Sequence, residues 1–102
     1  MKNQHLESFL EVLAVEKNAA QNTLDAYKAD LTDFLSTKNP LTCTEADIEK
    51  YLQNLSRQGF SGKTISRKIS SIKQFFLFLF TEQICSTNPA AYICAPKQAK
   101  TL

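Results

Sequence analysis

Apolar residues recur at steps of three and four along most of this 102-residue chain, which is the spacing that places them on one face of an α-helix. The pattern predicts four helices, over residues 4–17, 20–36, 45–58 and 62–83. No segment alternates apolar and polar residues as a half-buried strand does. Because the predicted loops are short, we expect an all-α protein, a compact four-helix bundle.

Local signals predict where these helices begin and end. Pro40 excludes the residue before it from the helical conformation and so ends the second helix. Thr44 is placed to cap the third helix, and Gly59 to end it by adopting a left-handed conformation. Ser61 is placed to cap the fourth. A short fifth helical turn is expected near the C-terminus, around residues 90–93.

The fourth predicted helix has two different faces. Its apolar stripe faces a core, while the opposite face carries cations, hydroxyls and an amide: Lys63, Arg67, Ser70 and Gln74, flanked by Lys68 and Ser71. A basic stripe near a helix N-terminus suits a helix that docks on phosphates, and it also suits a solvated outer face.

The second half of the same helix is apolar on every side. Residues 75–80 read FFLFLF, and such a segment must be covered all round. Phe78 points toward the basic face. Two alternatives stay open for its cover: the segment around Tyr92 folding back, or a contact with another domain or protomer.

Charge is distributed unevenly along the chain. Residues 1–60 hold six basic and nine acidic side chains, a net charge of −3, whereas residues 61–102 hold six basic side chains and one acid, a net charge of +5. A polyanion responds to local charge density rather than to the total of +2. The C-terminal half is therefore the predicted binding region.

Candidate catalytic and metal-binding chemistry is absent from the sequence. The single histidine, His5, has no evident nucleophile or ligand partner, and the three cysteines form no CxxC pair. Two glycines in the whole chain cannot form a phosphate loop. We therefore expect no catalytic residue, no metal and no cofactor in this chain. With neither a signal peptide nor a membrane-spanning run, it is predicted to be cytoplasmic, either cytosolic or associated with the nucleoid.

Four segments occur in an order that is more specific than any one of them: AQNTLDAYKADLTDFL, LTCTEADIEKYL, GFSGKTISRKISSIKQFFLFLF and a terminal TNPA. In this order the chain resembles the N-terminal core-binding domain of tyrosine site-specific recombinases, the phage integrase and Xer-type family. The resemblance extends from about residue 6 to residue 96.

The resemblance implies a SAM-like bundle of two crossed helical hairpins that forms half of a C-shaped clamp around double-stranded DNA. Residues 1–96 would be this domain, and residues 97–102 a linker toward a C-terminal catalytic domain. The parent protein would recombine or integrate DNA through a phosphotyrosine, as a tetramer of recombinase protomers. None of that chemistry is expected in this chain.

The resemblance also implies which residues face the major groove. They are Asn22, Thr23 and Ala26 of the second helix, and Lys63, Thr64, Arg67, Lys68 and Ser71 of the fourth. We add three candidate DNA-binding residues on chemical grounds: Ser61 for its capping hydroxyl, Gln74 for its amide, and Lys28, the one basic residue of the second helix.

Within this interface Arg67 could read a guanine edge or contact a phosphate. Asp25 could accept a hydrogen bond from cytosine or repel phosphate, and Asp30 could serve as an ion-pair partner. If Lys63, Arg67 and Lys68 each neutralise one phosphate, log K should fall with log salt at a slope of about −2.7.

Two other functions remain alternatives. One is a helical protein-interaction module without DNA binding, and the other is a helix-turn-helix regulator, for which no dimerisation element is visible.

Overall fold

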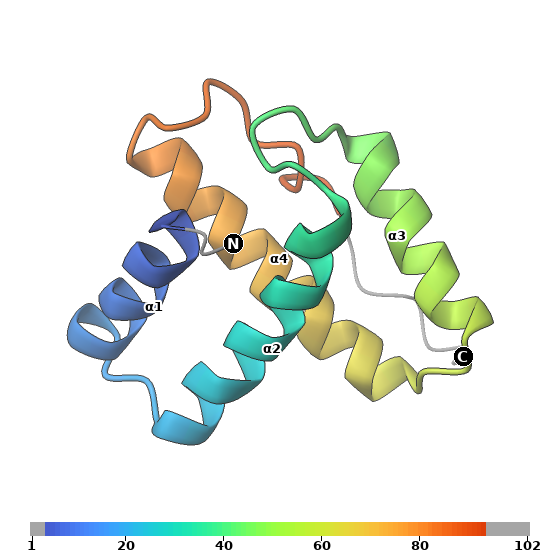
Figure 1. Ribbon diagram of the computed structural model, residues 1–102, viewed down its shortest axis with the longest axis horizontal. Coiled ribbons are helices and arrows are strands. Elements are labelled where there is room, and N and C mark those ends of the chain that lie inside the picture. Colours follow the sequence, from blue (N-terminus) through green and yellow to red (C-terminus); the bar gives the residue numbers. More distant parts are fainter. Residues whose placement is uncertain (1–3, 94–102) are drawn as a thin grey trace.

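Three helices pack around a fourth, α4, to form the described part of the domain (Figure 1). The computed structural model describes residues 4–93 and contains α1 (Gln4–Glu16), α2 (Gln21–Thr37), α3 (Glu45–Arg57) and α4 (Gly62–Thr81). All four predicted helices are confirmed, and residues 4–93 contain no strand. The chain forms a hairpin of α1 and α2 and a second of α3 and α4, and α4 crosses α2 obliquely (Figure 1).

The predicted helix ends have the expected geometry. The Thr44 hydroxyl accepts from the backbone N–H of Asp47 at 3.2 Å, and the Asp47 carboxylate accepts from the backbone N–H of Thr44 at 3.1 Å, which completes a capping box. Gly59 lies after α3 with φ +92°, a conformation that residues with a Cβ rarely adopt. Ser61 caps α4 by accepting from the backbone N–H of Thr64.

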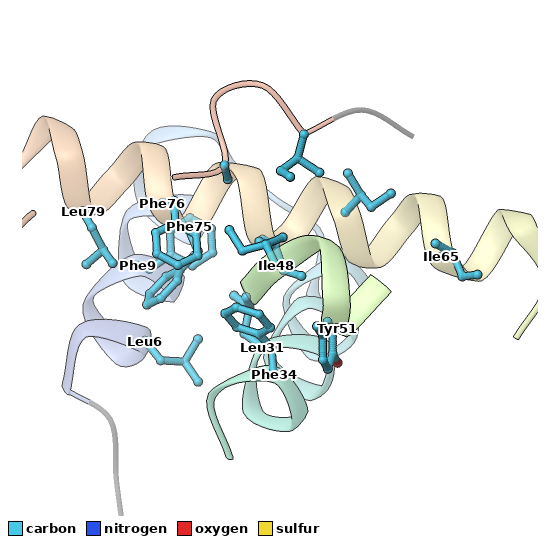
Figure 2. Packing of buried hydrophobic residues seen from close by; sticks show 14 of the residues in the cluster. Leu6, Phe9, Leu31, Phe34, Ile48, Tyr51, Ile65, Phe75, Phe76 and Leu79 are labelled. Atoms are coloured by element: carbon cyan, nitrogen blue, oxygen red, sulfur yellow. The ribbon is translucent and has the colours of Figure 1, made fainter. Parts of the chain in front are cut away.

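Phe9 of α1 and Phe34 of α2 pack against the all-apolar half of α4 (Figure 2). Phe75 and Phe76 are fully buried, with the Phe75 ring 5.5 Å from that of Phe9 and the Phe76 ring 6.1 Å from that of Phe34. The Phe34 ring also meets the edge of Tyr51 in α3 at 5.0 Å. These contacts join α1 and α2 to α4, and α3 directly to α2.

Phe78 packs against α1 and not against the segment around Tyr92. Its ring lies 5.7 Å from that of Phe9, so that α1 provides the cover, while Tyr92 is exposed. The sequence did not show this contact because periodicity does not say which helix packs beside a given face. Leu77 and Phe80, on the outer side of the same segment, stay 53% and 46% exposed.

The segment after α4 returns to the core without forming a helix. Its backbone makes two hydrogen-bonded turns, from Ala91 N–H to Asn88 O and from Ile93 N–H to Ala90 O, so that the expected fifth helical turn is not confirmed. Ala90 and Ile93 are buried, and Lys73 Nζ donates to the Ile93 carbonyl at 2.7 Å. The predicted linker, residues 97–102, lies outside the described residues.

Candidate nucleic-acid interface

One face of α4 presents the predicted polar stripe to solvent. Lys63, Arg67 and Ser70 are exposed and Gln74 is half-buried. Their spacing of four, three and four residues keeps these side chains on one side of the helix, along its N-terminal two thirds. The stripe therefore forms a continuous polar surface with cations near the start of the helix.

Two residues predicted for this surface lie inside the protein instead. Lys68 is 8% exposed, and Ser71 is fully buried with its hydroxyl donating to the Lys68 carbonyl at 2.8 Å. Each helical residue turns the side chain by about 100°, so that the position after Arg67 faces α2 rather than solvent. Neither side chain is available to touch DNA in this structure.

Asp30 of α2 holds both neighbouring cations of α4. Its Oδ2 accepts from Arg67 Nε at 2.9 Å, and its Oδ1 accepts from Arg67 Nη2 at 2.9 Å and from Lys68 Nζ at 3.1 Å. Asp30 is 2% exposed, whereas the Arg67 side chain is 47% exposed. The expected ion-pair role of Asp30 is thus present, and the three side chains together carry a net charge of +1.

The pKa values of this network follow from its contacts. Burial by itself would raise the pKa of the Asp30 carboxyl, but the hydrogen bonds and charges of Arg67 and Lys68 lower it below its ordinary value. The hydrogen bond to Asp30 raises the pKa of Arg67. The Asp30 carboxylate is therefore charged at neutral pH, and it offsets one of the two cations.

The N-terminus of α4 has its hydroxyls paired with each other. Ser61 Oγ accepts from the backbone N–H of Thr64 at 3.2 Å and donates to Thr64 Oγ1 at 3.1 Å. The N–H groups of residues 62 and 63 precede the first helical hydrogen bond, which runs from Ile65 N–H to Ser61 O. These two groups, more than the Ser61 hydroxyl, are the donors at this helix end that would be available to an anion.

The start of α2 offers a second set of donors. Its cap residue, Ala20, makes no side-chain hydrogen bond to the first turn, and Asn22 and Thr23 are exposed. Thr23, Ala26 and Asp30 follow one another at steps of three and four residues, so that they share the face of α2 that meets Arg67.

Lys28 lies apart from this face. It is two residues from Asp30, which turns its side chain to another side of the helix. There it lines a shallow groove with Asp25 and Asp33. The structure therefore does not bring Lys28 together with Lys63 and Arg67.

Comparison with known proteins identifies the fold. Residues 6–83 match the family described as "Phage integrase, N-terminal SAM-like domain". The chain belongs to this family. The resemblance seen in the sequence is thereby confirmed. The matched residues include both hairpins and the polar stripe of α4.

Curated relatives of this SAM-like domain carry the name tyrosine recombinase XerD. The one from Rhizobium meliloti is 38% identical over 107 residues, covering 100% of this chain and 34% of the relative. Those from Agrobacterium fabrum and Oceanobacillus iheyensis are each 40% identical, covering 95% of this chain and 31% and 35% of the relatives. The chain spans about a third of the length of these relatives. No solved structure matches it significantly.

Two features are absent from residues 4–93. No three His, Cys, Asp or Glu side chains in this range are grouped so that they could hold a metal ion. None of the described helices is long and apolar enough to cross a membrane.

Proposed function

We propose that this SAM-like domain binds double-stranded DNA as one half of a clamp, with the start of α2 and the N-terminal two thirds of α4 facing the major groove. The observation that carries the proposal is the exposure of Lys63, Arg67 and Ser70 on one face of α4. Thr23 and Ala26 lie on the adjoining face of α2. Hydroxyls, cations and helix N-termini are the groups that contact a phosphate backbone.

The proposal extends to the longer protein because the relatives are named tyrosine recombinases and are about three times as long as this chain. Residues 1–96 would form the core-binding domain, and residues 97–102 would lead to a separate catalytic domain. That domain would break and rejoin DNA through a phosphotyrosine, in a tetramer of protomers on paired sites. In this division of labour the present chain holds the DNA and performs no chemistry.

The proposed interface differs from the one expected from the sequence. It keeps Asn22, Thr23 and Ala26 on α2, and on α4 it keeps the exposed stripe with the N–H groups of the first turn. It omits the buried side chains of Lys68 and Ser71 and the distant Lys28. Ser61 and Thr64 contribute by shaping the helix start rather than through free hydroxyls.

Charge reversal tests the interface. Lys63→Glu combined with Ser70→Glu places two negative charges on the stripe without touching a buried contact, so duplex binding measured by fluorescence anisotropy should be abolished while the circular dichroism melt is unchanged. Lys50→Glu, at an exposed position of α3, is the matched control and should bind like the wild type. Arg67→Glu is unsuitable, because it would set a second carboxylate against Asp30.

The alternative, a protein-interaction module without DNA binding, has one observation in its favour. Leu77 and Phe80 are large apolar side chains that remain about half exposed on α4. The same experiment separates the two functions, since a wild-type chain that binds no duplex would favour the alternative.

A further inference from the structure

We propose that Asp30 is a positioning residue, which fixes Arg67 so that the free edge of its guanidinium group reads a guanine base rather than contacting phosphate. The inference rests on the proposed DNA binding, and it assigns a role to the buried acid at the crossing of α2 and α4.

The geometry leaves Arg67 with a second pair of donors. A guanidinium group has five N–H groups, and Asp30 takes one from Nε and one from Nη2. The remaining Nη2 N–H and the Nη1 N–H beside it form a parallel pair on the next edge of the plane. Asp30 is buried while Arg67 is half exposed, so that the edge turned away from Asp30 is the part that a ligand can reach.

The two hydrogen bonds between Arg67 and Asp30 make this arrangement rigid, because they engage both oxygens of a buried carboxylate. The Lys68 ammonium group binds Asp30 Oδ1 at 3.1 Å from within the protein and adds a second cation to the same carboxylate. A side chain that is already ordered loses little conformational freedom when it binds. The Nη1 and Nη2 N–H groups of Arg67 that do not bind Asp30 are therefore held in one orientation before DNA binds.

A fixed direction favours a base over a phosphate as the ligand. A phosphate offers acceptor oxygens on several sides, so that a mobile cation can bind it from many orientations. A guanine offers O6 and N7 as two acceptors in one plane, and two N–H groups must be aligned with both of them to donate to each. Orienting Arg67 with a buried carboxylate offsets part of its charge, which would weaken phosphate binding but does not weaken the geometric match to guanine.

Selection from a pool of randomised duplexes tests the role of Arg67. The wild-type chain should enrich a G·C pair at one position, with a preference of roughly 5- to 150-fold over other bases. Arg67→Lys keeps the charge but loses the paired, coplanar N–H groups, so that the guanine preference should fall markedly.

Substitutions of Asp30 and Lys68 separate the orientation of Arg67 from the effect of charge. Asp30→Asn offers an amide that can accept from Arg67 at one atom only, so that guanine enrichment should be lost while affinity for the unselected pool is kept. Lys68→Met is the matched control. It removes one cation from Asp30 and leaves both hydrogen bonds between Asp30 and Arg67 in place. It should retain the guanine preference.

A measurement on the wild-type chain without DNA covers the case in which Asp30→Asn does not fold. Nitrogen-15 NMR should show hindered rotation of the Arg67 guanidinium group, with resolved Nη signals. Arg57, the exposed second arginine of the chain, should show averaged signals and serves as the internal reference. Signals of Arg67 averaged like those of Arg57 would overturn the proposal.

The outcomes distinguish this proposal from the proposed function. If the chain binds no duplex, DNA binding itself is refuted. If it binds with salt dependence but enriches no guanine, or if the enrichment survives Asp30→Asn, only the positioning role is refuted.

Discussion

Replacing Asp30 by alanine is expected to destabilise the domain strongly, because it removes a buried carboxylate that pairs with two cations. The change deletes three charge-assisted hydrogen bonds and leaves the Lys68 ammonium in a site where its side chain is only 10% exposed. Removing one partner of a buried ion pair costs about 3–5 kcal/mol. Arg67 can turn to solvent, so that we expect the lower end, about 3 kcal/mol.

Urea unfolding followed by circular dichroism measures this loss. With an m-value of about 1–3 kcal/mol/M for a small domain, the midpoint should fall by at least about 1 M. The double variant Asp30→Ala, Lys68→Met removes the stranded cation as well, and it should be more stable than Asp30→Ala by at least about 1 kcal/mol. The single variant Lys68→Met, which leaves the Arg67 fork on Asp30, should lose less than Asp30→Ala.

The reasoning would be refuted in two ways. One is an Asp30→Ala variant whose free energy of unfolding stays within about 0.5 kcal/mol of the wild type, the range typical of surface substitutions. The other is a double variant that is no more stable than Asp30→Ala. That result would mean that the unpaired Lys68 ammonium group does not destabilise the Asp30→Ala variant.

Three further predictions follow from named contacts. The folded-state pKa of Asp30 lies below its ordinary value, so that its contribution is complete above the unfolded pKa and is lost as the pH falls through the folded pKa; thermal melts from about pH 6 to about pH 2 should show this loss in the wild type, and less of it in Asp30→Asn. Ser61→Ala removes the cap of α4 and should cost about 1 kcal/mol in urea unfolding, whereas an unchanged midpoint would contradict the capping role. Phe9→Ala removes the ring that packs on Phe75 and Phe78 and should cost about 3–5 kcal/mol by the same assay, while a loss below about 1 kcal/mol would contradict the contact.

Local sequence signals were sufficient for the helices and their ends. The steps of three and four residues define each helix without reference to the rest of the chain. Thr44, Gly59 and Ser61 act within one turn of their own position, so that their effects can be read from neighbouring residues. The family resemblance added the arrangement of the two hairpins, which periodicity alone does not determine.

The side chains at the edge of the core could not be placed from the sequence. Lys68 is charged and is therefore predicted to be a surface residue. It is buried because it pairs with Asp30, which lies 38 residues earlier in the chain, so that no local pattern indicates the contact. Phe78 likewise depends on Phe9 of α1. In both cases the deciding contact is between helices, and a pattern within one helix contains no information about it.

This correction changes the expected electrostatics of DNA binding. The sequence counted Lys63, Arg67 and Lys68 as three phosphate-neutralising cations. With Lys68 buried on Asp30, the exposed stripe retains Lys63 and Arg67.

The salt dependence of duplex binding by this chain is the most direct test of the proposed function. Because Arg67 is assigned to a guanine base, Lys63 is the cation of the exposed stripe that is assigned to phosphate. It predicts that log K falls with log salt at a slope of about −0.9, and that Lys63→Gln brings the slope close to zero. A slope near zero, or one that Lys63→Gln leaves unchanged, would contradict the assignment of this face of α4 to DNA.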